Sequence, residues 1–493
     1  MPPEPWERIT LHDHDHNHGN AHGGCQAQTL SNEQLADFVP RFESMARDHG
    51  LSFYPVDFEL VPNQFMMEVA VYGLPVRMPH WSFGVRYIYQ YVQHRMGSSR
   101  IFEVVFPGDP NRAYLVDDNA LPENTLVTAH VLGHADFSRN NSLFERMQRE
   151  VGYHIVEQTA DRAHRIQEAI EQHGQSRVEA VLDAALALEQ HIDTNKAVHR
   201  PDYVGQDESR EKKEARIRGA FEKRFGQLPG EEPAAETGRR DERRRIPPAP
   251  EYDLLWFIAR HAPDMQAWER DIFLAVREES FYFYPVFACQ IMNEGWASYW
   301  HARLLREADF LPGRVYLDAI KTHSDVVRPY GGDQSVALQV NPYHLGFRMW
   351  ERIVENLGLD AAMRIRAEED DFGFVRNYLD QDLATELQLF NYARRPGAAG
   401  EERFIVKDRE LNNLKENLLA PKFNYGAPRI YAESIGLDGS LDLGHDHDGD
   451  GRGLDLNRAK RVLEYIHRVW RRPVRIATVD HAGEPRVLEH DED

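Results

Sequence analysis

From Thr125 the chain reads TLVTAHVLGHADFSRNN (125–141), the beginning of a helical pattern that continues largely to His191. Residues 252–308 have the same character and predict two or three further helices, because their apolar side chains recur at helical spacing. Three shorter segments repeat the pattern, at 33–49, 341–356 and 375–392. These segments predict a core that is mainly α-helical.

The β content is expected to be minor. Residues 102–106 and 113–116 lie on either side of a PGDPNR turn and predict a hairpin-like pair of strands. Near the C-terminus, short apolar runs surround one amphipathic helix, LNRAKRVLEYIHRVW (456–470). These runs lie at 403–406, 429–435 and 474–479. The predicted fold class is mainly α with minor β (α+β), with a small C-terminal α+β domain.

The composition divides the chain into five consecutive parts. A His-rich tail and a charged segment closed by prolines lack the apolar residues of a core, and the tail is expected to be disordered. The parts are the tail (1–30), an N-terminal α+β and helical part (31–195), the charged linker or insert (196–250), a helical part (251–400) and the C-terminal domain (401–493).

The overall composition excludes several classes of protein. The chain has 493 residues and a net charge of −22, which argues against a general nucleic-acid-binding protein because such a protein needs a cationic surface. It contains no apolar run of about 18 residues, so no membrane span is expected. It begins without a secretory signal and has only two cysteines. A cytoplasmic protein is therefore expected.

His130 and His134 have the spacing of two metal ligands on one helix. Four residues advance a helix by about 400°, so both imidazoles project from nearly the same side. The neighbouring Val127, Val131 and Leu132 are apolar, which indicates a largely buried helix. A buried pair of imidazoles requires polar partners, and a metal ion is one.

Glu294 and His301 lie seven residues apart, about 10 Å along a helix, and so share a face. One helix seldom gives two residues at this separation to one ion, so one is expected as a ligand and the other beside it. The small Gly295 and Ala297 should allow another helix to approach closely. A structural ion pair with an arginine is the alternative explanation for Glu294.

The stretch NEGWASY resembles the corresponding helix of gluzincin metallopeptidases, whose Glu is the third zinc ligand. That resemblance implies gluzincin-like metal-site helices and a site formed by His130, His134 and Glu294. The ion is expected to be zinc, although another divalent metal is possible. The gluzincin general base directly follows the first His, and here Val131 occupies that position. Either another side chain is the catalytic base or the site is not hydrolytic; the candidates are His301, Asp136 and Glu279.

A longer resemblance covers most of the chain from about residue 32. Seven stretches in matching order resemble the SpoVR-like (stage V sporulation protein R) family. They are HWSFG (80–84), AHVLGHADFSRNN (129–141), LLWFIARHAP (254–263), VREESFYFYP (276–285), IMNEGWASYWH (291–301), NPYHLGF (341–347) and HDGDGRGLDL (447–456). The resemblance implies a cytoplasmic protein linked to spore cortex formation, whose biochemical activity is poorly defined.

Three functions remain open from the sequence. The first is a metal-dependent hydrolase-like protein in sporulation or cell-envelope physiology, which by analogy acts on an amide or peptide bond. The second is a regulatory or scaffold protein with a structural metal, and the third uses the charged segment to bind an acidic partner. All three leave the protein or peptide partner unknown. A two-metal site that adds His154, Glu157, Glu278 and Glu279 is a weaker alternative, because the doubled Glu-x-x-His pattern is absent.

Overall fold

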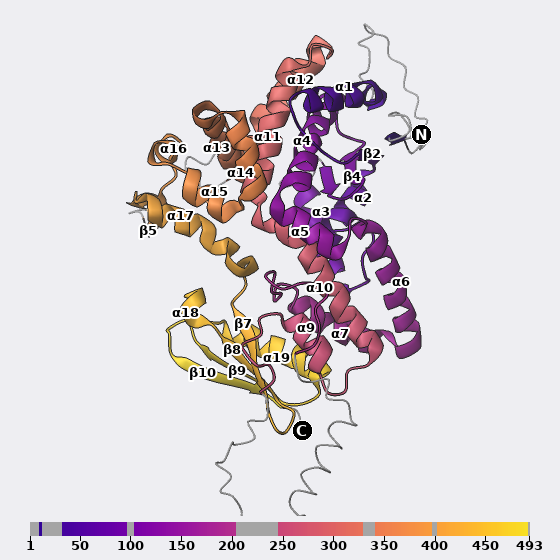
Figure 1. Cartoon of the computed structure of the whole chain (residues 1–493), viewed down its shortest axis with the longest axis vertical. Helices are drawn as coiled ribbons and strands as arrows, with labels where there is room; N and C mark the ends of the chain where they lie inside the picture. The colour runs from indigo at the N-terminus through magenta and orange to yellow at the C-terminus, as the bar shows by residue number, and fades with distance from the viewer. Residues whose placement is uncertain are drawn as a thin grey trace, which may run out of the picture. The chain divides into compact units, whose positions relative to one another are not determined.

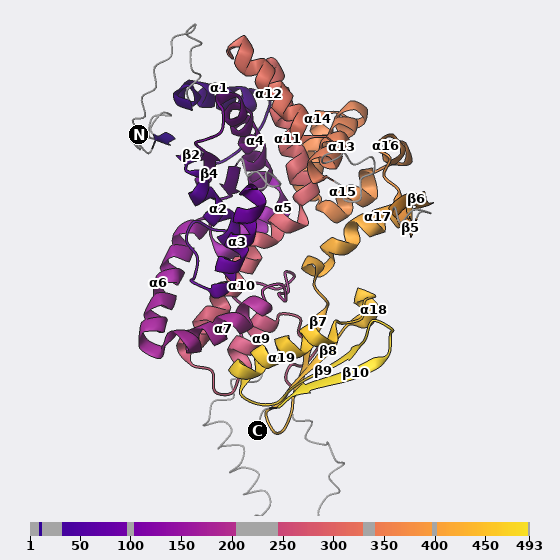
Figure 2. The same ribbon diagram turned by 180° about the vertical axis from the view of Figure 1, so that it is seen from behind.

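The computed structural model describes residues 9–11, 32–95, 103–203, 245–328, 341–396 and 402–491. These residues form a mainly helical protein with three small sheets, as the sequence predicts (Figures 1 and 2). Of the predicted tail, only residues 9–11 are described, and most of the charged segment also lies outside the described residues. No helix in the described ranges is long and apolar enough to cross a membrane.

The chain folds into two compact units, each built from two stretches of sequence. Unit 1 contains Met1–Gly174 and Glu278–Gly426, and unit 2 contains Gln175–Arg277 and Ala427–Asp493. The long helix α10 (Ala267–Ala288) contributes to both units. Unlike the five consecutive parts predicted from composition, each unit joins segments that are distant in the sequence.

Helices dominate unit 1. Its N-terminal segment contains α1 (Leu35–Asp48), α2 (Asn63–Tyr72), α3 (Trp81–Arg95), α4 (Leu121–Asn140), α5 (Ser142–Val151) and α6 (Ile155–His173). Its second segment contains α11 (Gln290–Glu307), α12 (Gly313–Val326), α13 (Pro342–Leu357), α14 (Leu359–Glu368), α15 (Asp371–Tyr378), α16 (Gln381–Glu386) and α17 (Leu411–Leu419). The helices α4 and α11 lie side by side in both views, and their buried residues belong to one continuous core (Figures 1 and 2).

Two sheets accompany these helices. The first has the strand order β1-β2-β4-β3, with β1 at Ile9–Leu11, β2 at Val56–Val61, β3 at Glu103–Phe106 and β4 at Asn111–Val116. The expected hairpin is confirmed, because β3 and β4 pair antiparallel. The second sheet pairs β5 (Asn391–Pro396) with β6 (Glu402–Asp408).

The prediction of a single helix at 375–392 is wrong. The chain leaves helical geometry at Leu379, and the Asp380 carboxylate then accepts a hydrogen bond from the backbone N–H of Leu383, which starts α16. Strand β5 begins at Asn391. An aspartate that caps a new helix competes with continuation of the old one, and this competition divides the segment.

Unit 2 contains the predicted C-terminal helix and the apolar runs at 429–435 and 474–479, whereas the run at 403–406 belongs to β6 of unit 1. The helix expected at 456–470 is confirmed as α19 (Leu456–Trp470). The sheet has the order β10-β9-β8-β7, with β7 at Ile430–Ile435, β8 at Leu441–His445, β9 at Val474–Val479 and β10 at Pro485–His490. Unit 2 also contains the helices α7 (Gln175–Ala187), α9 (Leu254–His261) and α18 (His447–Asp450).

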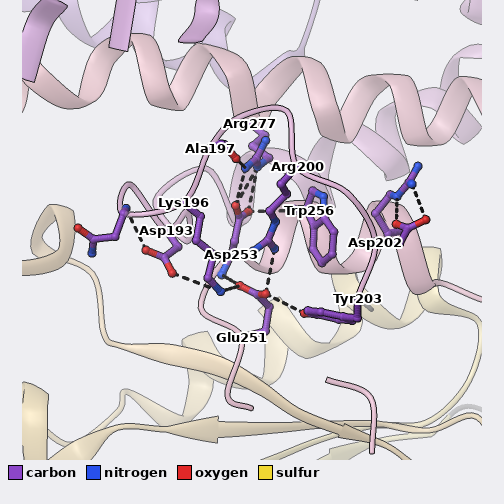
Figure 3. A network of polar contacts seen from close by, with 12 residues as sticks. Asp193, Lys196, Ala197, Arg200, Asp202, Tyr203, Glu251, Asp253, Trp256 and Arg277 are labelled. Carbon is purple, nitrogen blue, oxygen red and sulfur yellow. Dashed lines mark hydrogen bonds and ion pairs between the residues drawn. The ribbon is translucent and has the colours of Figure 1, made fainter. Parts of the chain in front are cut away.

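A buried carboxylate network in unit 2 joins residues 196–203, at the start of the charged segment, to Glu251 just after its end (Figure 3). Glu251, which is almost fully buried, accepts hydrogen bonds from Lys196 Nζ and Tyr203 Oη, each at 2.7 Å. Its other cationic partner is Arg200, at 2.9 Å. Burial disfavours the ionised form, but these donors outweigh it and hold the pKa of Glu251 below its usual value. The chain is therefore fixed on both sides of residues 204–244.

A second buried pair extends this network. Asp253 and Arg277 are both almost fully buried, and Arg277 Nε donates to Asp253 Oδ2 at 2.9 Å. The Asp253 carboxylate also caps α9, because its Oδ1 accepts from the backbone N–H of Trp256 at 3.1 Å. One carboxylate thus satisfies a helix terminus and a buried cation together.

Candidate metal centre

The helix α4 carries His130 and His134 through the core of unit 1. It begins with a Glu123 side chain that accepts from the backbone N–H of Ala120 at 2.9 Å and with a proline in its first turn. Almost every residue from Leu121 to Ser138 is buried. A helix in this position is buried on all sides, so its two imidazoles must find polar partners within the protein.

The helix α11 carries Glu294 and begins at a buried carboxylate. Asp371 accepts hydrogen bonds from the backbone N–H groups of Ile291 and Met292, each at 2.9 Å. Lys422 pairs with the same carboxylate at 2.9 Å. A negative charge at a helix N-terminus is favourable because it satisfies free N–H groups and opposes the helix dipole. This anchor fixes the start of α11 one turn before Glu294.

Small residues bring three helices into close backbone contact around Glu294. A Cβ added to Gly133 of α4 would lie 2.6 Å from the Ala297 Cα of α11. A Cβ added to Gly295 would lie 2.3 Å from the carbonyl carbon of Gly346 in α13. The expectation that Gly295 and Ala297 permit a close helix approach is therefore confirmed on both sides of α11.

These approaches bring together the three side chains that the spacing and the resemblance single out. Glu294 Oε2 lies 3.6 Å from His130 Nε2 and 3.5 Å from His134 Nε2. One donor atom from each of the three residues lies within 4.8 Å of the others. In a tetrahedral zinc site the donor atoms are about 3.4 Å apart, as zinc–ligand distances near 2.1 Å require. The donor set and its spacing fit one divalent ion.

The other ring nitrogens of both histidines have hydrogen-bond partners. His134 Nδ1 lies 2.9 Å from Asn293 Oδ1, and His130 Nδ1 lies 2.8 Å from His301 Nδ1. Asn293 Oδ1 is an acceptor, so His134 carries its proton on Nδ1 and presents a lone pair at Nε2. Metal-bound histidines in proteins are oriented in this way by the partner of their second nitrogen.

Two buried atoms at this site have no hydrogen-bond partner among the described residues. They are His130 Nε2 and Glu294 Oε2, the atoms that face each other. Leaving a buried polar atom without a partner costs about 1–3 kcal/mol. Such atoms in a folded protein require an explanation, and a bound ion between them supplies one.

The titration of the three donors is strongly perturbed. Burial, together with the charge of His134, lowers the pKa of His130 to about 4. Burial also opposes protonation of His134, but the charge of Glu294 outweighs it and raises the pKa of His134. Burial would raise the pKa of Glu294, yet His134 and His130 hold it well below its usual value. The pKa values of the two imidazoles are thus shifted in opposite directions, while the Glu294 carboxyl stays ionised near neutral pH.

Sequence reasoning missed a second carboxylate at the site, Glu103. This residue lies at the start of β3, and its Oε1 is 3.9 Å from His130 Nε2. Burial raises the pKa of Glu103 to about 7, with His134 lowering it and Glu294 raising it. The stretch FEVVF contains no recognisable ligand spacing, so nothing in the local sequence distinguished this glutamate.

Two other residues near the site were also missed. The Tyr343 ring stacks against His130 with centroids 6.1 Å apart, and the negative charge of Glu294 raises the pKa of Tyr343. His301 Nε2 lies 2.6 Å from His323 Nδ1 on α12. The NPYHLGF stretch that contains Tyr343 offered a signal for one of them, whereas His323 belongs to none of the quoted stretches.

The three candidate bases have different surroundings. His301 is at the site, in contact with His130. Asp136 is fully buried in an ion pair with Arg366, and its Oδ2 also accepts from Trp296 Nε1 at 2.9 Å. Glu279 Oε2 accepts from Arg77 Nε at 2.8 Å.

The glutamates of the two-metal alternative also have cationic partners. Glu278 pairs with Arg162, and Glu157 pairs with Arg112 at 2.6 Å. The compact group of metal-ligating side chains found in the described ranges contains His130, His134 and Glu294 alone. The geometry therefore favours a single ion.

Comparison with known proteins places the chain in a family. A family model described as "SpoVR like protein" matches residues 29–426. The chain belongs to the SpoVR-like family. This SpoVR-like chain is also 28% identical to the "Uncharacterized protein YcgB" of Escherichia coli (strain K12), over 92% of this chain and 93% of that protein. No solved structure matches the chain significantly.

Proposed function

We propose that this SpoVR-like protein is a cytoplasmic, metal-dependent hydrolase-like protein with one divalent ion, most simply zinc, held by His130, His134 and Glu294. The observation that carries the proposal is the approach of Glu294 Oε2 to within 3.6 Å of both Nε2 atoms. Two imidazoles and one carboxylate are a donor set of catalytic zinc sites and leave one coordination position open. A bound ion would supply a Lewis acid that polarises a carbonyl group and acidifies water.

Glu103 is the proposed general base, the role for which Val131 is unsuited. Its carboxylate faces the donor atoms from β3 rather than from the helix of the first histidine. In this position Glu103 Oε1 accepts a proton from the attacking water and returns it to the leaving nitrogen of an amide. An amide or peptide bond is proposed as the substrate by analogy with the gluzincin peptidases. The link to spore cortex or cell-envelope physiology rests on the family resemblance.

A non-catalytic protein with a structural ion is the second candidate, and the burial of the site favours it. The side chains of His130 and His134 are 3% and 11% exposed. If a fourth protein ligand completes the coordination, the ion joins α4 to α11 and β3 and performs no chemistry. Zinc X-ray absorption on the loaded protein distinguishes the candidates, because it separates three protein ligands plus water from four protein ligands.

The first experiment measures the number of bound ions. All proteins carry serine in place of the five tail histidines, so that the tail does not contribute. These are His12, His14, His16, His18 and His22. We expect one zinc per chain in this background and none after His130→Ala/His134→Ala. Equal stoichiometry in the two proteins would overturn the ligand assignment.

A second experiment compares zinc retention after substitution of Glu294, the proposed ligand, and of His301, a neighbour of the site. Glu294→Gln is expected to reduce zinc retention on dialysis more than His301→Ala does, because Glu294 supplies a charged donor atom and His301 only contacts a ligand. The opposite ranking would mean that the two roles are exchanged.

A further inference from the structure

We propose that His130, His301 and His323 form a directional hydrogen-bond chain that sets the tautomer of His130 and so decides whether this ring can bind a metal ion. The inference rests on the metal centre proposed above, and it assigns His301 and His323 as positioning residues. The three imidazoles come from three helices, α4, α11 and α12.

Both contacts in the chain join two ring nitrogens. His130 Nδ1 lies 2.8 Å from His301 Nδ1, and His301 Nε2 lies 2.6 Å from His323 Nδ1. A neutral imidazole has one N–H donor and one acceptor nitrogen. Each contact therefore needs one proton, and its position on one ring determines its position on the next.

The chain has two self-consistent arrangements. In the first, His130 donates from Nδ1 and keeps a lone pair on Nε2, His301 donates from Nε2, and His323 accepts at Nδ1. In the second, every donor and acceptor is exchanged, so that His130 Nε2 carries the proton. Only the first arrangement presents the His130 lone pair toward Glu294, and only the first is able to bind a metal ion.

Burial makes mixed arrangements costly. His130 and His301 are both buried, at 2% and 0% exposure. A mixed arrangement would place two lone pairs or two N–H groups against each other without water to solvate them, and such unsatisfied groups are expensive in the protein interior. The tautomers of the three rings therefore change together, and His323, which is half-buried, is the outer end of the chain.

The acceptor at the outer end thus favours metal binding at the inner end. When His323 Nδ1 accepts from His301 Nε2, the His301 Nδ1 lone pair is available to hold the His130 proton on Nδ1. Without this acceptor, the N–H at His301 Nε2 that the binding-competent arrangement requires would be buried and unpaired, which penalises that arrangement. Residues that orient metal ligands in this way typically change metal affinity by about 10-fold to 100-fold.

The test compares two substitutions at the outer end in the full chain with the tail histidines replaced. His323→Leu removes the acceptor, and we expect zinc affinity to fall by about 10-fold. His323→Asn keeps an acceptor oxygen in the place of Nδ1, and we expect it to retain affinity within about 3-fold of the parent. His164→Leu, at an exposed histidine on α6, is the control and should have no effect.

Nitrogen-15 spectra of histidine-labelled protein provide the readout that a merely structural role would not change. In the zinc-loaded protein, the His130 proton should be on Nδ1, and the His301 and His323 protons should be on Nε2. The signals are assigned by their loss in single variants.

The outcomes separate this inference from the proposed function. If the parent protein binds no zinc, both the proposed metal centre and the hydrogen-bond chain are refuted. If the parent binds zinc but His323→Leu binds it as tightly, or if His301 carries its proton on Nδ1 in the loaded protein, the chain is refuted while the metal centre stands. Equal loss in His323→Leu and His323→Asn would also refute the chain, because a retained acceptor would then have no effect.

Discussion

Gly133 of α4 lies directly against Ala297 of α11, and a Cβ on Gly133 would be 2.6 Å from the Ala297 Cα. This contact is one helical turn from His130, on the helix that faces Glu294. We predict that Gly133→Ala forces α4 and α11 apart and lowers the free energy of unfolding by about 1–3 kcal/mol, the usual cost of overpacking a core. Denaturant unfolding measures this loss.

The same substitution should also weaken zinc binding, because it separates the imidazoles from the carboxylate. Gly84→Ala is the matched control: Gly84 lies in α3, and an added Cβ there would meet nothing within 4 Å. Equal stability and zinc affinity in the two alanine variants would contradict the role given to the Gly133 contact.

Glu103→Gln tests the carboxylate that replaces the missing gluzincin base. The amide has a similar shape but accepts a proton poorly, so we expect zinc to remain bound while amide hydrolysis falls by about 100-fold or more. Zinc content and turnover of a peptide library measure the two effects in one preparation. Loss of zinc together with activity would instead identify Glu103 as a fourth ligand and favour the structural ion.

Zinc affinity is expected to depend on pH through His134. The negative charge of Glu294 raises the pKa of His134 above its usual value, so the metal-free ring is protonated below that pKa and must lose a proton to bind the ion. As the pH falls through this pKa, the affinity should fall by about tenfold per pH unit. His130 has a pKa of about 4, so it is already deprotonated over this range and loses no proton when the ion binds.

Calorimetric titration in the Glu103→Gln background measures this dependence. That background is chosen because Glu103 has a pKa of about 7 and would contribute a proton of its own. We expect one proton released per zinc at pH values below the His134 pKa. A constant affinity between about pH 5.5 and 8 would show that His134 is not a ligand.

The sequence predicted those parts of the site that depend on local spacing. The separation of His130 and His134 is a property of one helix, and the small Gly295 and Ala297 indicated the close approach of a second helix. Glu294 was found because it lies in a long stretch that resembles a known family. Each of these signals is contained within about three helical turns.

The remaining residues of the site could not be predicted because tertiary packing alone brings them there. Glu103 reaches His130 from a strand, and His323 reaches His301 from a helix that carries no quoted motif. Asp136 shows the opposite case. It lies two residues after His134 and was a natural candidate base, yet the fold turns it toward Arg366.

Asp136→Asn tests whether this aspartate is structural. It is fully buried, and Arg366, Trp296 Nε1 and the Ser52 backbone N–H all donate to it. Removing one partner of a buried ion pair leaves the other charge uncompensated, so we expect the free energy of unfolding to fall by about 3 kcal/mol or more.

The exposed pair Arg314–Asp318 provides the control for this prediction. Both side chains are more than half exposed, so Asp318→Asn should cost less than about 1 kcal/mol. Zinc affinity of folded Asp136→Asn should remain within about 3-fold of the parent, because none of the donors to Asp136 is a proposed ligand. If instead Asp136→Asn keeps its stability and loses hydrolysis with zinc still bound, Asp136 is a catalytic residue and the base assigned to Glu103 is wrong.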